Sequence, residues 1–334
     1  MSRQHRITPS QSLWSRNDKE GKVKSMRIYG DSIIVAVDAG YGNMKTANCD
    51  FPTGLITCAE KPFFIESLLT YDGRYYLIGT GHKEFSDKKI ADEDYYILTL
   101  AAIARELNTQ RITRAKVILA VGLPLTWWAS QRESYRNYLL KNKSVDFNYR
   151  GTNFHIDFED AMIYPQGYAA IADRLNEFRE VNIIADIGNG TVNLLRVVDR
   201  HADMASMATE ACGVKECAIA MRLALANQHG GAKVDDSVIE RIIRTGTARI
   251  DASYLQTLVN AAQKYTDNLF RRFREYGYDE KTMRLYVVGG GSCLIRNFGK
   301  YDPALVTINS DLHANARGYE QIAYETLKKR GARP

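Results

Sequence analysis

The sequence of 334 residues predicts an α/β protein with two related lobes. Short apolar runs, typical of buried strands, alternate along the chain with segments whose apolar residues recur at helical spacing. A unit of strand, Asp-x-Gly-x-Gly turn and second strand occurs once in each half, at residues 38–42 and 186–190. The length also fits two domains, because one domain usually has about 100–200 residues. We therefore expect mixed sheets covered by helices, with matching hairpins in the two lobes.

In the first half, five segments are predicted as strands. Residues 33–38 form a short apolar run that ends in an acidic residue and a glycine turn, and residues 44–49, 73–79, 116–121 and 153–158 are the other strand candidates. Three segments have helical features: residues 92–107 begin with acidic residues, Thr126 is a candidate N-cap of a helix ending at Leu140, and Pro165 suits the first turn of a helix that continues to Leu175.

In the second half, the same patterns predict three further strands and five helices. The expected strands are residues 182–186, 192–198 and 284–288. The expected helices are residues 214–228, 235–244 and 252–275, a short helix after the glycine triplet 289–291, and a final helix at 315–328.

Composition excludes several classes of protein. With 45% hydrophobic and 25% charged residues, the chain is too apolar for a disordered protein. No window approaches the roughly 18 apolar residues of a membrane helix, and the N-terminus lacks the apolar core of a signal peptide. The five cysteines form no C-x-x-C pair and the six histidines are scattered, which disfavours a disulfide scaffold or a zinc module. We therefore expect a soluble cytoplasmic protein with reduced thiols.

The net charge of +6 lies mainly in residues 1–27, which hold seven Lys or Arg against two acidic residues. The rest of the chain is almost neutral, so no basic domain typical of a DNA reader is expected. The N-terminal segment is interpreted either as a flexible, solvated tail or as an accessory contact to DNA, a membrane surface or an acidic partner.

The repeated turns have the composition of phosphate-binding hairpins. Glycines in Asp38-Ala-Gly-Tyr-Gly42 and Asp186-Ile-Gly-Asn-Gly190 let backbone N–H groups approach phosphate oxygens. An aspartate at the end of a strand supplies the hard oxygen that Mg²⁺ prefers, usually through water. Two such hairpins that face each other would hold a polyphosphate from both sides. The alternative is a pair of ordinary hairpin turns.

Two further features extend this hypothesis. Lys45 follows Asp38 by seven residues and can return along the second strand to the same phosphates, or else lie on a solvated face. The glycine triplet 289–291 joins a strand to a helix. It allows a flat ring to lie against the backbone and directs a helix N-terminus towards a phosphate, or it is only a sharp structural turn.

Together these motifs resemble those of the actin-like ATPase superfamily, which includes actin, Hsp70 chaperones and sugar kinases. Residues 38–45 resemble its first phosphate motif, 186–191 its second, and 288–293 its adenosine motif. Residues 163–170 are similar to the connecting segment that carries the residue positioning the attacking water. The motifs occur in family order and span most of the chain.

Within the superfamily, the short length and the Asn43-x-Lys45 ending look most like plasmid-segregation actins of the ParM and Alp type. The resemblance implies an actin-like bilobed fold with ATP, or GTP, and Mg²⁺ in the interlobe cleft. It also implies filaments of this chain with itself and a DNA-binding adaptor at a plasmid centromere, without direct sequence-specific DNA contact or membrane attachment. One departure is Tyr41, where actins often carry Ser or Thr.

The resemblance also implies domain boundaries and site roles. The first lobe would span residues 28–164, with helix 315–330 packing back on it, and the second lobe residues 165–314. Gln166 would orient the attacking water, and Asp186 would polarise it and hold Mg²⁺ together with Asp38. The nucleotide-binding candidates are Asp38, Gly40, Tyr41, Gly42, Asn43, Lys45, Gly188, Asn189, Gly190, Thr191, Lys215, Glu216, Gly289, Gly290, Gly291 and Ser292. For Lys215 and Glu216, ribose contact competes with ordinary solvation.

Other functions of the same fold stay open at this point. A sugar or acyl-group kinase would need a carboxylate base, and no persuasive base stands out in the sequence. A chaperone-like ATPase, or a nucleic-acid binder led by the N-terminal segment, is a further alternative. Trp127 and Trp128 are interpreted as filament-interface aromatics or as core, and the arginines at 271, 272 and 274 as a subunit contact or a solvated face.

Overall fold

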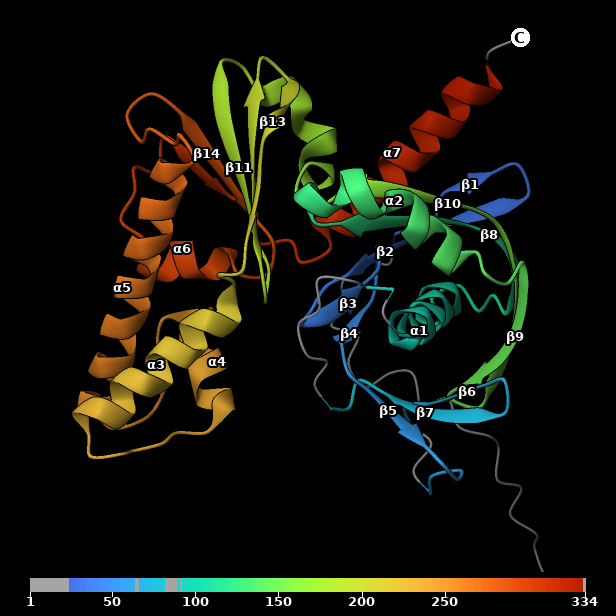
Figure 1. The fold of residues 1–334 in the computed structure, drawn as a ribbon, viewed down its shortest axis with the longest axis horizontal. Helices are drawn as coiled ribbons and strands as arrows, with labels where there is room; N and C mark the ends of the chain where they lie inside the picture. Colours follow the sequence, from blue (N-terminus) through green and yellow to red (C-terminus); the bar gives the residue numbers. More distant parts are fainter. Residues whose placement is uncertain (1–23, 64–65, 82–88, 91, 333–334) are drawn as a thin grey trace, which may run out of the picture.

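The computed structural model describes residues 24–63, 66–81, 89–90 and 92–332, and the N-terminal segment before Lys24 lies outside the described residues. Two sheets dominate the fold and lie next to each other, as Figure 1 shows. The first sheet has the order β4-β3-β2-β8-β10-β9-β6-β7-β5, with β1 paired to β2. The second has the order β13-β12-β11-β14-β15. The α/β fold class and the two mixed sheets predicted from the sequence are thus confirmed.

The strands of the first sheet are β1 (Ile28–Tyr29), β2 (Ser32–Ala39), β3 (Asn43–Lys45), β4 (Asp50–Pro52), β5 (Leu55–Cys58), β6 (Leu68–Tyr71), β7 (Arg74–Ile78), β8 (Arg114–Leu123), β9 (Ser144–Tyr149) and β10 (Thr152–Pro165). The sheet curves around helix α1 (Asp94–Asn108), and helix α2 (Leu125–Leu139) follows β8 (Figure 1). Strands β2, β8 and β10 run parallel at its centre.

Strand β2 is buried on both faces, which explains its uninterrupted apolar sequence. Val35 and Val37 pack in the core that contains α1. Ile34 and Ala36 point the opposite way and pack against helix α7 (Ala314–Gly331). The C-terminal helix therefore covers the face of the first sheet that α1 leaves open.

The second sheet consists of β11 (Val181–Ile187), β12 (Val192–Val198), β13 (His201–Glu210), β14 (Arg284–Val288) and β15 (Val306–Ile308). Helices α3 (Val214–Gln228), α4 (Asp236–Thr245), α5 (Ala252–Glu275) and α6 (Ser292–Phe298) gather on one face. Strand β11 repeats the β2 arrangement: Ile183 and Ala185 face those helices, and Ile184 faces the 3₁₀ segment η1 (Ala169–Glu177).

The predicted starting points of two helices are wrong. Pro165 ends β10 instead of beginning a helix, because β10 continues past a bulge between Phe158 and Asp160 and pairs with β8 up to Leu123. The helix expected there is a 3₁₀ segment that starts four residues later. Thr126 lies inside α2, whose N-cap position is Pro124 and which ends at Leu139.

The ends of the described chain meet on one side of the molecule. Met26 is buried, and the backbone N–H of Arg27 donates to Glu320 Oε1 in α7 at 3.0 Å.

In the part of the chain that the structure describes, no helix combines the length and the apolar character that a membrane crossing requires.

Candidate functional site

The first hairpin places Asp38 and Lys45 opposite each other. They are paired residues of β2 and β3, and Lys45 Nζ lies 3.5 Å from Asp38 Oδ2. Only 14% of the Lys45 side chain and 5% of the Asp38 side chain are exposed, so the lysine does not lie on a solvated face. Gln166 Nε2 donates to Asp38 Oδ1 at 3.0 Å. The structure thus brings together three residues that the sequence singled out separately.

The carbonyl oxygens of the first turn are bound from within the protein. The Ala39 carbonyl accepts from Lys89 Nζ. Thr53 donates twice: its hydroxyl to the Gly40 carbonyl at 2.7 Å and its N–H to the Gly42 carbonyl at 2.9 Å. Carbonyl oxygens carry the negative end of the peptide dipole. Because Lys89 and Thr53 hydrogen-bond these oxygens, the turn repels an anion less.

The second hairpin is fastened to the start of α3 in a similar way. Val214 N–H donates to the Gly188 carbonyl at 3.1 Å, and Lys215 N–H to the Asn189 carbonyl at 2.9 Å. Gly213 is required for this approach, because a Cβ there would lie 2.4 Å from the Asn189 carbonyl oxygen. The backbone of Lys215 therefore supports the turn, while the side chains of Lys215 and Glu216 are exposed.

The glycine triplet packs against the same hairpin. Gly289 has φ +86°, and a Cβ on it would lie 2.4 Å from Asp186 Oδ1. Gly291 N–H donates to the Ile187 carbonyl at 2.8 Å. A Cβ on Gly290 would meet only Leu312, at 3.5 Å. Two of the three glycines thus pack closely against Asp186 and Ile187, whereas the position of an added Cβ at Gly290 is almost free of neighbours. Ser292, which begins α6, is buried.

Asp186 is the next-to-last residue of β11 and is 5% exposed. Burial raises its pKa to about 6, and the negative charge of Asp38 adds to the effect, while Asn315 and Lys45 oppose it. Two buried carboxylates that repel each other form a donor set suited to a divalent cation, which would relieve the repulsion. Asp38 and Asp186 therefore fit the Mg²⁺ that the sequence motifs imply. No group of three or more His, Cys, Asp or Glu residues in the described ranges could hold a metal ion.

The two hairpins meet at their tips. A Cβ on Gly42 would lie 2.8 Å from the Asn189 Cβ. Tyr41, also in the first turn, packs edge-on against Trp127 with ring centroids 6.4 Å apart. Trp128 donates from Nε1 to the Ile163 carbonyl at 2.8 Å, which makes it part of the first lobe's packing. Both turns, both aspartates, Lys45 and Gln166 thus form one region.

Sequence reasoning missed two residues of this region. Lys89 is 1% exposed, and burial lowers its pKa to about 8 although Asp38 opposes the shift. Asn315 is 6% exposed and contacts Asp186. Lys89 follows a run of charged residues that suggests a solvated loop, and Asn315 stands in a short Ala-Asn-Ala run whose small residues are the only local signal of close packing.

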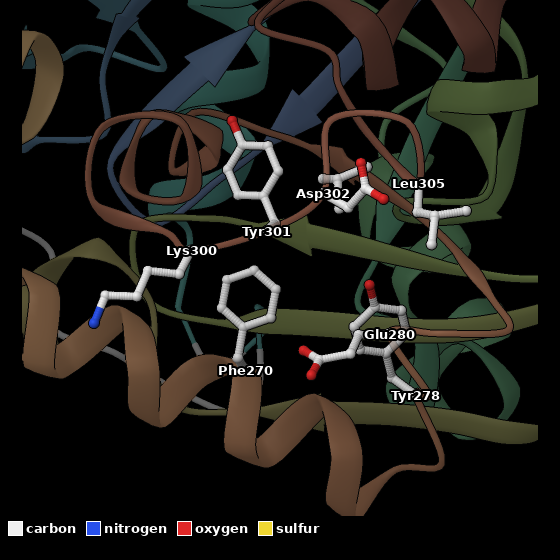
Figure 2. A pocket seen from close by; sticks show the side chains of 8 residues that line it. Phe270, Tyr278, Glu280, Lys300, Tyr301, Asp302 and Leu305 are labelled. Atoms are coloured by element: carbon white, nitrogen blue, oxygen red, sulfur yellow. The ribbon is translucent and has the colours of Figure 1, made fainter.

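Two of the surface cavities formed by described residues lie in the second lobe. One, of about 220 Å³, is lined by Cys212, Glu216 and Tyr265 among others, and the Tyr265 hydroxyl donates to the Cys212 carbonyl at 2.7 Å. This places Glu216 beside a cavity at the start of α3. The other, of about 250 Å³, lies between the end of α5 and the chain before β15 (Figure 2). Figure 2 shows aromatic rings around it with charged groups at its edge, and none of the predicted site residues lines it.

Comparison with known proteins identifies the fold. The family model described as actin like proteins N terminal domain matches residues 36–168, which include the first hairpin and Gln166. No curated protein sequence matches the chain.

Solved structures match over most of the chain. The archaeal actin homologue Ta0583 is 18% identical, with a TM-score of 0.71, covering 87% of this chain and 99% of its own. The actin-like protein Alp7A is 14% identical, with a TM-score of 0.69, covering 89% and 97%. The pSK41 ParM protein is 15% identical, with a TM-score of 0.66, covering 90% and 99%. The chain therefore has the actin-like fold.

Similar structures include nucleotide complexes and a filament. Ta0583 has been determined in complex with ADP, and Bacillus thuringiensis ParM with ATP. Alp12, which is 18% identical with a TM-score of 0.66, has been determined as a filament, with coverage of 89% of this chain and 99% of its own.

Proposed function

Because the chain has the actin-like fold and an actin-like N-terminal domain, we propose that it binds and hydrolyses ATP, or GTP, between its two hairpins and assembles into filaments. We further propose that these filaments segregate plasmid DNA in the cytoplasm through an adaptor protein. The observation that carries the proposal is the convergence of both turns with Asp38, Gln166 and Asp186. The nucleotide and filament structures of similar proteins support it.

The hairpins would bind the phosphates from opposite sides. In the first, residues 40–43 and Lys45 would contact phosphate oxygens, and in the second residues 188–191 would do so. Lys215 and Glu216 would meet the ribose, and the backbone at Gly290 and Ser292 would meet the base. Asp38 and Asp186 would hold Mg²⁺ through water, and the ion would supply neutralisation of phosphate charge when bound.

Hydrolysis would need positioned groups more than covalent chemistry. The Gln166 amide, which donates to Asp38 Oδ1 in the present structure, would orient the attacking water. Asp186 would polarise that water through a carboxylate oxygen while it helps to hold Mg²⁺.

Gln166→Ala is expected to lower the turnover number for phosphate release by about 10²-fold, because a positioning group acts mainly in the transition state. The dissociation constant for a non-hydrolysable ATP analogue should change by no more than about threefold, since Gln166 lies beside the aspartates and not in either turn. Gln256→Ala, on the exposed face of α5, is the matched control and should behave as the parent chain. Equal turnover in the two variants would contradict the role.

Filament formation is tested by right-angle light scattering with Mg-ATP, Mg-GTP or no nucleotide, while phosphate release is followed in parallel. The proposal predicts a nucleotide-dependent rise above a critical concentration, followed by decay as phosphate appears, because head-to-tail contacts that do not close produce open polymers. A flat trace with slow hydrolysis would favour a non-polymerising kinase or chaperone-like ATPase. A flat trace without hydrolysis would contradict the proposed nucleotide chemistry.

A further inference from the structure

The first turn of α7 contacts two parts of the candidate site through one side chain. Asn315 Nδ2 donates to Asp186 Oδ2 at 2.9 Å. Asn315 Oδ1 accepts from the backbone N–H of Gly167 at 3.0 Å. Gly167 follows Gln166 directly, so a single carboxamide links the Asp186 carboxylate, near the end of β11, to the turn that carries the glutamine.

The same helical turn also reaches the first hairpin. His313 Nδ1 lies 2.9 Å from the Thr46 carbonyl, and Arg317 Nε donates to the Ala47 carbonyl at 3.0 Å. Thr46 and Ala47 follow Lys45, the last residue of β3. The start of α7 thus contacts the chain next to each of the three segments that carry Lys45, Gln166 and Asp186.

Close packing fixes the position of this turn. A Cβ on Gly318 would lie 1.8 Å from the Ala169 carbonyl oxygen, so α7 approaches η1 as closely as glycine permits. The Tyr319 hydroxyl lies against Gly122 of β8 in the same manner. Ala316, Tyr319 and Ala323 are fully buried in the cluster shared with β2 and β8. A helix held so tightly leaves Asn315 little freedom to follow a movement of Asp186.

We propose that Asn315 is a positioning residue, whose carboxamide sets the spacing between the Asp186 carboxylate and the Gln166 amide so that both act on one water molecule. The inference rests on the proposed hydrolysis. A carboxamide suits the position because it donates and accepts at once. Leucine makes neither hydrogen bond, and aspartate keeps the acceptor for Gly167 but loses the donor to Asp186.

The test compares Asn315→Leu and Asn315→Asp in the full chain, with Lys329→Ala on the exposed end of α7 as the control. Hydrogen exchange of the Gly167 amide in nucleotide-free protein should rise at least tenfold in the leucine variant and stay near the parent rate in the aspartate variant. The turnover number should fall at least tenfold in both, while the dissociation constant for a non-hydrolysable ATP analogue in the leucine variant changes less than threefold. If the leucine variant does not fold, Asn315→Ser replaces it.

Two results would overturn the inference. One is an unchanged turnover number in folded variants whose parent hydrolyses ATP. The other is unchanged Gly167 exchange in the leucine or serine variant, which would show that the carboxamide does not hold the turn whether or not the chain hydrolyses nucleotide. A third result is a parent that does not hydrolyse ATP, together with the expected pattern of Gly167 exchange. This result would contradict the proposed function. Asn315 would then hold the turn without a role in hydrolysis, so the inference would also be rejected.

Discussion

Asp186→Asn is expected to reduce phosphate release by at least about 10²-fold and, at the same time, to stabilise the nucleotide-free protein. The loss of activity follows from removing the negative charge that would hold Mg²⁺ and polarise the attacking water. The gain in stability follows from removing a buried charge that lies near Asp38. Asparagine has nearly the same shape and can still accept the hydrogen bond from Asn315.

The stability gain should depend on pH in a defined direction. The pKa of Asp186 is raised from 3.8 to about 6 in the folded chain, so the folded state binds the proton more tightly than the unfolded state. The ionised carboxylate therefore lowers the free energy of unfolding by about 3 kcal/mol above pH 6, and this effect fades as the pH falls towards 4.

Urea unfolding of the parent and of Asp186→Asn at several pH values measures the difference in their free energies of unfolding. The variant should exceed the parent by about 2–3 kcal/mol at pH 7.5 and by less than about 1 kcal/mol at pH 4. Asp267→Asn, an exposed position of α5, is the control and should show neither change. If Asp186→Asn were less stable than the parent at pH 7.5, it would contradict the conclusion that the ionised Asp186 carboxylate destabilises the folded protein.

Gly289→Ala is expected to lower the free energy of unfolding by at least about 2 kcal/mol. The residue has φ +86°, where an L side chain is strained, and the added Cβ would lie 2.4 Å from Asp186 Oδ1 and 2.6 Å from the Ile187 carbonyl oxygen. Part of the molecule must move to admit it, and the groups displaced are those of the candidate site.

Gly290→Ala is the matched control for this prediction, because its φ is not positive and its Cβ would meet only Leu312 at 3.5 Å. Its free energy of unfolding should stay within about 1 kcal/mol of the parent value. Urea unfolding of the two variants side by side provides the comparison. Similar losses at both positions would contradict the specific packing of Gly289 against Asp186.

Local signals predicted much of the second lobe. Helices α4 and α5 begin where the sequence suggests, since Asp235 and Asp251 each accept backbone N–H bonds at the N-cap. In the first lobe, the paired positions of Asp38 and Lys45 also follow from a local feature, the hairpin between β2 and β3. These features depend on residues close together in the sequence, so a single chain reveals them.

Features that depend on contacts between distant parts of the sequence were harder to predict. The length of β10 depends on its pairing with β8 and β9, and its sequence alone shows only a short alternation of polar and apolar residues that ends at Phe158. Lys89 and Asn315 reach the site across 50 and 129 residues of sequence, to Ala39 and Asp186 respectively. In the sequence, Lys89 looks like an ordinary loop residue and Asn315 like an ordinary residue at the start of a helix. Only the folded structure shows which residues they contact.

The most direct test of the central claim, that the two hairpins bind a nucleoside triphosphate, is calorimetric titration of the full chain with Mg-ATP, beside Lys45→Met. The claim predicts saturable binding of one ATP per chain, and at least about tenfold weaker binding in the variant, because the proposed site has the lysine charge facing the phosphates. Absence of saturable binding to the parent with both Mg-ATP and Mg-GTP, or equal affinity in the two proteins, would contradict the claim.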